Sequence, residues 1–190
     1  VEPRGRSLNN VNLFLLHATL EQAISKRDGP PWNLVPNYLD GPEVVWFAPI
    51  RTKPKRTYDK YGLSFSPEGD HTPYLIRHLI ARKTRREEFT KYISRAGSNS
   101  QLFESLAIKA YGRKVTSPFE LDVVLKGQAL RIGDVGYGVS QALPIIVELF
   151  ARPKRTWFAI QQPEVHLHPR AQAALGNLFF EAAQRDNKIH

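Results

Sequence analysis

The 190-residue sequence contains no cysteine, which excludes disulfide bonds and thiolate metal sites. No apolar run approaches the roughly 20 residues that a membrane-spanning helix needs, and no signal-peptide pattern follows Val1. These absences suit a cytoplasmic protein without a membrane partner. The phosphate-binding motif G-x-x-x-x-G-K-[ST] is also absent, because the nearest feature, Gly112-Arg113-Lys114, lacks its spacing.

The charge of the chain is strongly unbalanced. Lys and Arg number 27 against 18 Asp and Glu, a net charge of +9, while 42% apolar residues fit a globular domain. The basic residues cluster at 51–56, at 152–155, and at Arg82, Lys83, Arg85 and Arg86. Such clusters can contact phosphate backbones, so the third cluster is a predicted nucleic-acid contact. A generally basic, solvated surface is the alternative.

Hydrophobic spacing predicts helices and strands in alternation, which is typical of an α/β fold. The expected helices are 10–26, a segment capped by Thr72, the pattern from Phe89 to Ile93, 102–110, a segment capped by Ser140 that runs to Phe150, and a segment beginning at Pro169. The expected strands are a run from Val44 to Pro49, Phe119 to Leu125 with a return through Leu130 after a Lys126-Gly127 turn, a buried run from Trp157 to Ile160, and the start of another at Lys188. Residues 97–100 are expected to form a loop.

The stretch DVGYGVSQALPIIVELF, residues 134–150, places a glycine turn directly before an apolar helix. A helix N-terminus exposes unpaired N–H groups and a partial positive charge, and glycines allow an anion to approach the backbone closely. Gly136 and Gly138 could form such a turn, with Ser140 and Gln141 as side-chain donors. The stretch is therefore a candidate phosphate clamp, and a purely structural capped helix is the alternative.

A second polar stretch, WFAIQQPEVHLHP, begins at Trp157. Ligands of open α/β sheets collect at the carboxyl ends of strands, which is where Gln161, Gln162 and Glu164 fall. Such side chains can hold a magnesium hydrate and orient a water molecule. A surface turn is one alternative. A zinc site of Glu164, His166 and His168 is another, although no HExxH motif supports it.

Together the two stretches resemble the late half of an ABC-class ATPase head of the SMC, RecF and OLD-like group, which belongs among AAA-family ATPases. The resemblance covers about two thirds of the chain and rests on Gly136, Gly138, Ser140 and Gln141 as the signature motif, and on residues 157–169 as the Walker B strand with its following loop. It also takes in residues 47–58, more loosely. It implies a partial head of sheet strands and flanking helices, with a helical insertion. It also implies Mg²⁺ and two ATP molecules held between two heads, with the signature loop contacting the partner's nucleotide in trans.

By the same resemblance, Gln161, Gln162 and Glu164 are catalytic, with Gln161 near Mg²⁺ through water, and His166 and His168 lie in a dimer-contacting D-loop. The family usually has an acid where Gln161 stands, and a neutral amide cannot act as a base. The resemblance divides the chain into core residues 1–70, a lid-like insertion at 71–112 and the signature and Walker B part at 113–190. It places the P-loop and the switch histidine outside the chain, which alone is not expected to hydrolyse ATP.

The function expected from these features is an ATP-driven switch for nucleic-acid repair or anti-phage defence. The expected partners are a second copy or a second ATPase head, nucleic acid, and a nuclease or toxin effector. The alternative function is a non-catalytic module that binds nucleic acid or protein and retains the ABC shape.

Overall fold

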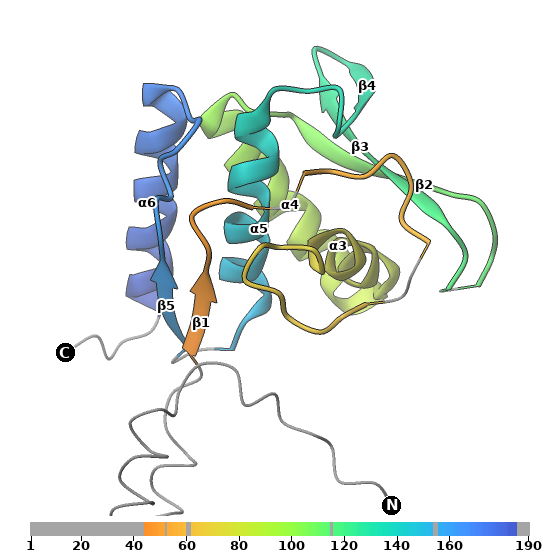
Figure 1. Cartoon of the computed structure of the whole chain (residues 1–190), viewed down its shortest axis with the longest axis horizontal. Helices are drawn as coiled ribbons and strands as arrows, with labels where there is room; N and C mark the ends of the chain where they lie inside the picture. The colour runs from red at the N-terminus through yellow and green to blue at the C-terminus, as the bar shows by residue number, and fades with distance from the viewer. Residues whose placement is uncertain (1–43, 52, 60–61, 115, 154–155, 186–190) are drawn as a thin grey trace, which may run out of the picture. The chain divides into compact units, whose positions relative to one another are not determined.

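The computed structural model describes residues 44–185, except residues 52, 60–61, 115 and 154–155 (Figure 1). The predicted helix at 10–26 and the strand predicted from Lys188 lie outside this described part. The elements are β1 (Val44–Phe47), α3 (Thr72–Ala81), α4 (Lys83–Ser100), β2 (Ser105–Ala110), β3 (Phe119–Leu125), β4 (Gln128–Arg131), α5 (Tyr137–Ala151), β5 (Trp157–Ile160) and α6 (Pro169–Arg185). Helices and strands are mixed along the chain, which confirms the predicted α/β class.

The chain forms two compact units, and the first comprises Val1–Trp46 and Arg155–Ala159. Its described part is the pairing of β1 with β5, whose arrows run the same way in Figure 1. Both strands were predicted, but the prediction that β5 is buried is wrong. Trp157 is 66% exposed, and exposed and half-buried residues alternate along β5. This is the pattern of a strand with one open face.

The core of the second unit, Phe47–Lys154 with Ile160–His190, is built around α5. Helix α5 packs against α3, α4 and α6, and Figure 1 shows it between α3 and α6. Its buried residues occupy nearly the whole circumference from Val139 to Phe150. A helix that is buried on nearly all sides belongs inside a domain, so α5 fixes the position of any group carried at its first turn.

A three-stranded antiparallel sheet in the order β2-β3-β4 forms one side of this unit. Strand β3 and the turn at Lys126 and Gly127 are confirmed, and both turn residues have the positive φ of a type I′ hairpin, 50° and 74°. The prediction of a helix at 102–110 is wrong. Residues Ser105–Ala110 pair with Phe119–Val124 as β2, because partners distant in sequence decided the conformation of this short segment.

The loop predicted at 97–100 is instead the last turn of α4. Any side chain at Gly97 would collide with Phe103, since a Cβ there would lie 2.3 Å from the ring, so this glycine permits close packing and does not break the helix. Ser100 donates its hydroxyl to the carbonyl of Ala96 at 2.8 Å, and Gln101 ends the helix in the left-handed conformation.

The starts of three helices also bear on the predictions. The cap of α3 is His71, and the prediction of Thr72 as the cap is wrong: the carbonyl of His71 accepts the N–H groups of Tyr74 and Leu75, while Thr72 is already helical. Helix α4 begins at Lys83, so the basic cluster forms its first turn. Helix α6 begins at Pro169 as predicted and buries one face, which comprises Ala171, Ala174, Leu175 and Leu178.

No helix in the described part is long and apolar enough to cross a membrane.

Candidate functional site

The glycine turn before α5 has a different cap from the predicted one. Gly136 is the N-cap residue, and its carbonyl accepts the N–H of Val139 at 3.1 Å, so the prediction of Ser140 as the cap is wrong. Ser140 lies within the first turn, where it is buried and donates its hydroxyl to the carbonyl of Tyr137 at 2.7 Å. Gly136 and Tyr137 are exposed, so these two residues form the accessible part of the glycine turn.

The structure brings the glycine turn and the turn after β5 into direct contact. A Cβ on Gly138 would lie 2.8 Å from the carbonyl oxygen of His166, so only glycine allows the two backbones to approach this closely. The rings of Tyr137 and His166 meet edge to face, with their centroids 4.8 Å apart. The two stretches that carry the family resemblance are therefore neighbours in space.

The turn at residues 161–168 presents Gln161, Gln162 and Glu164 to solvent. Two of its non-glycine residues have a left-handed backbone, Gln162 with φ 45° and His166 with φ 63°. Such conformations cost about 1–2 kcal/mol each and gather at functional sites. The buried side chain of Leu167, whose N–H binds the carbonyl of Glu164 at 3.1 Å, anchors the turn.

The two histidines of this turn have different environments. His166 is exposed beside Tyr137, whereas His168 accepts the N–H of Ala171 on Nδ1 at 3.3 Å and so satisfies a donor in the first turn of α6. Within the part of the chain that the structure describes, no three His, Asp or Glu residues gather as metal ligands.

Arg51 is a site residue that sequence reasoning placed in a surface cluster. It is 1% exposed, and its main chain is bound by the amide of Gln141, which accepts the Arg51 N–H at 3.1 Å and donates to the Arg51 carbonyl at 3.2 Å. Its guanidinium donates to the carbonyl of Gln161 at 3.0 Å. Burial lowers the pKa of Arg51, and attraction by Glu164 partly offsets this. Gln141 is therefore engaged with Arg51 and is not exposed.

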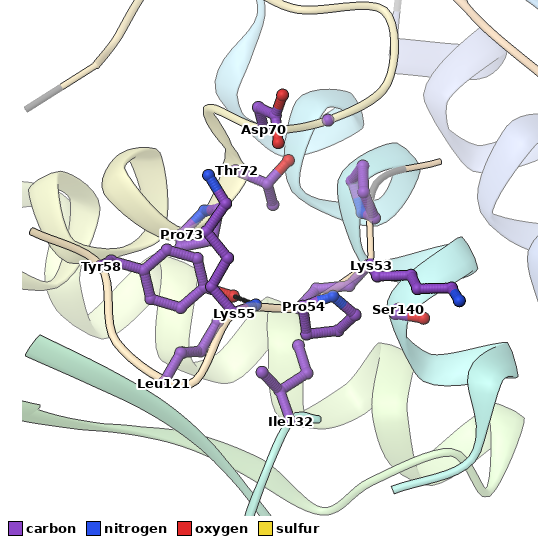
Figure 2. Close-up of a pocket in the computed structure, with 13 residues that line it drawn as sticks. Lys53, Pro54, Lys55, Tyr58, Asp70, Thr72, Pro73, Leu121, Ile132 and Ser140 are labelled. Atoms are coloured by element: carbon purple, nitrogen blue, oxygen red, sulfur yellow. Dashed lines mark hydrogen bonds between the residues drawn. The ribbon is translucent and has the colours of Figure 1, made fainter. Parts of the chain in front are cut away.

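A small pocket adjoins the first turn of α5 (Figure 2). Ser140 lines it together with Lys53, Lys55 and Tyr58, and the start of α3 contributes Thr72. The hydroxyl of Thr72 is buried and has no hydrogen-bond partner among the described residues. The lysines bring positive charge to the neighbourhood of Ser140.

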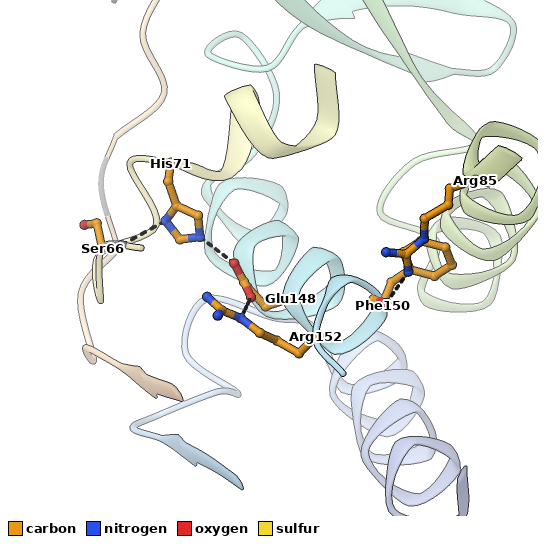
Figure 3. Close-up of polar contacts among 6 residues, drawn as sticks. All are labelled: Ser66, His71, Arg85, Glu148, Phe150 and Arg152. Atoms are coloured by element: carbon orange, nitrogen blue, oxygen red, sulfur yellow. Dashed lines mark hydrogen bonds and ion pairs between the residues drawn. The ribbon is translucent and has the colours of Figure 1, made fainter. Parts of the chain in front are cut away.

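A buried polar cluster anchors the other end of α5 (Figure 3). His71 accepts the Ser66 N–H on Nδ1 at 3.1 Å, so Nε2 carries the proton, and this proton is donated to Glu148 over 2.6 Å. Arg152 donates to the second carboxylate oxygen. Burial is the largest influence on Glu148 and acts to raise its pKa, but the bonds from His71 and Arg152 outweigh it, and the pKa lies below its usual value.

The predicted nucleic-acid contacts do not share one environment. Arg82, Lys83 and Arg86 are exposed at the start of α4. Arg85 is half-buried, with its guanidinium over the ring of Phe150 at 5.0 Å and a donated bond of 3.4 Å to the Phe150 carbonyl (Figure 3). Arg85 therefore holds α4 against the end of α5.

The donors of the turn at 161–164 suit Mg²⁺ in kind, because they are hard oxygen atoms and include one carboxylate. Mg²⁺ keeps several waters and commonly takes only one or two carboxylates from a protein. Glu164 would supply that carboxylate, and the amide oxygen of Gln161 could bind a water of the hydrate.

Comparison with known proteins gives one family. Residues 54–189 match the family described as "AAA domain, putative AbiEii toxin, Type IV TA system". The match covers more than two thirds of the chain and includes both contacting turns, while Arg51 lies just before it. No curated protein and no solved structure matches the chain.

Proposed function

The chain belongs to this family of AAA domains, and we propose from that membership that it forms part of an ABC-type ATPase head that dimerises around ATP and hydrolyses it. Domains of this family are ATPases that use a nucleotide and Mg²⁺. The observation that supports the finer proposal is the contact of the glycine turn with the turn after β5, made at Gly138 and His166. This contact brings together the two stretches on which the resemblance to an SMC, RecF or OLD-like head rests.

In this proposal the exposed backbone at Gly136 and Tyr137 faces the nucleotide of a second head. The buried helix α5 supports that turn, and the partial positive charge of its N-terminus favours an anion there. Ser140 steadies the turn through its bond to Tyr137, with the lysine-lined pocket behind it. His166, exposed next to Tyr137, would belong to the same dimer surface.

In the same proposal, the turn from Gln161 to Glu164 would act on the bound metal and on the attacking water. When bound, Mg²⁺ would offset negative charge on the phosphates. Gln161 would hydrogen-bond the attacking water or a metal-bound water, but its amide cannot accept a proton. Glu164 is the carboxylate of this turn and the candidate general base. A neutral Gln161 favours a head that holds ATP and turns it over slowly.

Phosphate release by the full-length protein tests these roles. Gln161→Glu should raise steady-state turnover, because a carboxylate there can assist proton removal, an effect of about 10²–10⁴-fold when fully expressed. Gln161→Ala should leave turnover at or below the parent value. Unchanged turnover in Gln161→Glu, with turnover eliminated in Glu164→Gln, would transfer the role to Glu164 alone. No turnover in any variant would favour the non-catalytic module.

We also propose that the start of α4 contacts nucleic acid, in keeping with a role in repair, anti-phage defence or a toxin–antitoxin system with a nuclease or toxin effector. Arg82, Lys83 and Arg86 lie at the positive end of the helix dipole, and the first turn contains no acid. Cations there are each unfavourable by about 0.3–1 kcal/mol. A phosphate partner would offset this local cost.

Salt-dependent binding of DNA and RNA tests this surface. The triple reversal of Arg82, Lys83 and Arg86 to Glu should weaken binding and reduce the log–log salt slope by about 0.7–0.9 for each phosphate that the protein no longer neutralises. Arg85 is kept because it packs on Phe150. A triple reversal of the exposed residues Lys109, Arg113 and Lys114 to Glu is the control. An equal slope in the α4 variant and the parent would remove this surface from the interface.

A further inference from the structure

The segment from Phe47 to Arg51 holds the main chain of Gln161 from two directions. The N–H of Gln161 binds the carbonyl of Phe47 at 3.2 Å, and the carbonyl of Gln161 accepts the guanidinium of Arg51 at 3.0 Å. These bonds fix the residue at which β5 ends and the polar turn begins. Glu164, three residues further, attracts the Arg51 guanidinium through its opposite charge.

The same arginine is fixed to the first turn of α5. The amide of Gln141 binds both the N–H and the carbonyl of Arg51, across 90 positions of sequence, and both residues are 1% exposed. Because Gln141 follows Ser140 directly, the position of the glycine turn is transmitted to Arg51 through these two hydrogen bonds. Arg51 thus touches both turns of the candidate site and connects them.

Burying an arginine in order to form one side-chain hydrogen bond is energetically unfavourable. Its Nε and Nη1 groups are buried without a partner among the described residues, and burying an incompletely paired cation is unfavourable. A neutral donor could bind the Gln161 carbonyl at lower cost. A buried and incompletely paired cation inside an ordered core is usually explained by a functional role.

We propose that Arg51 is a positioning residue that holds the turn from Gln161 to Glu164 in register with the glycine turn of α5. The proposal rests on the proposed ATPase function for its catalytic consequence. Arg51 orients Gln161 through its main chain and Glu164 through charge, so a change at the glycine turn is passed to the catalytic turn. Nucleotide contact by a partner head and water activation would be coupled in this way.

Hydrogen–deuterium exchange tests the link without requiring ATP. In Arg51→Gln, the amides of residues 161–168 should exchange about tenfold or more faster than in the parent, because a hydrogen bond from a charged donor is lost. Arg51→Lys, which keeps the charge but not the planar fork, should exchange at an intermediate rate. Arg56→Gln, a change at an exposed arginine of the same loop, should match the parent.

ATP turnover tests the catalytic consequence in the same variants. Arg51→Gln should lower kcat about tenfold or more and leave KM for ATP within about twofold, because the turn is misplaced while ATP binding is retained. Equal exchange at residues 161–168 in Arg51→Gln and Arg56→Gln would overturn the positioning role. So would faster exchange with unchanged kcat. If Arg51→Gln does not fold, the same criteria apply to Arg51→Lys. A parent without ATP turnover would defeat the proposed function, while exchange would still decide whether Arg51 holds the turn.

Discussion

Glu148→Ala should destabilise the protein by about 3–5 kcal/mol, the usual cost of removing one partner from a buried ion pair. Glu148 is 1% exposed and accepts bonds from His71 and Arg152, which anchor the 66–71 loop to α5. The substitution leaves the Nε2–H of His71, which is 3% exposed, without an acceptor, at about 1–3 kcal/mol. The charge on Arg152 and the cavity left by the side chain account for the rest. Arg152→Ala should cost less, because Arg152 is 20% exposed.

Urea denaturation of the parent and the two variants measures these differences. For a chain of this size, the expected loss in Glu148→Ala corresponds to a decrease in Tm on the order of 10 °C. A double-mutant cycle with His71→Ala should give a coupling energy of about 0.5–3 kcal/mol. A loss below about 1 kcal/mol in Glu148→Ala, or no coupling to His71, would refute the view that this cluster holds the loop on α5.

Three further predictions concern stability. The bonds from His71 and Arg152 hold the pKa of Glu148 below its ordinary value of 4.5. The contribution of Glu148 to the free energy of unfolding is therefore present above that pH and is lost as the pH falls through the lowered pKa. In acid titrations, the difference in unfolding free energy between the parent and Glu148→Ala should shrink accordingly. Gly97→Ala should lose about 1–3 kcal/mol by collision with Phe103, whereas Gly176→Ala, which meets no neighbour in the middle of α6, should gain up to about 1 kcal/mol; urea denaturation giving the same sign for both would contradict the packing described. Gly138→Ala should destabilise by a similar 1–3 kcal/mol through the His166 carbonyl, while Gly133→Ala, in open space, should change little; equal midpoints in urea would argue against the contact of the two turns.

Elements with a strong local pattern were predicted well from the sequence. Strict alternation marked β3, and helical spacing after Pro169 marked α6. The predictions were wrong where contacts with residues distant in sequence determine the local conformation. Gly97 is a helix breaker by its local preference, but Phe103 packs against it inside α4. Segment 105–110 becomes a strand because β3 offers it a partner.

The candidate site shows the same division. The contact between the glycine turn and the turn after β5 was not predicted from the sequence, and the close approach of Gly138 to the His166 carbonyl gives it a physical reason. No role in the site could be assigned to Arg51 from the sequence, because a basic residue in a loop interrupted by prolines is typical of the protein surface. Its burial depends on Gln141, 90 positions away, and no local pattern indicates that pairing. The cap at Gly136 was missed because Ser140 has the stronger local preference.

Light scattering of the full-length protein with and without Mg²⁺-ATP tests the central claim most directly, namely that the glycine turn contacts the nucleotide of a second head. Gly136 is the position to change, because it is exposed and nothing lies within 4 Å of an added Cβ, whereas Ser140 is buried. Gly133→Arg, equally open, is the matched control. The parent and Gly133→Arg should double in mass with ATP, while Gly136→Arg should bind ATP and stay monomeric. Dimerisation of Gly136→Arg to the same extent as the parent, or no ATP-dependent dimer of the parent, would contradict the account.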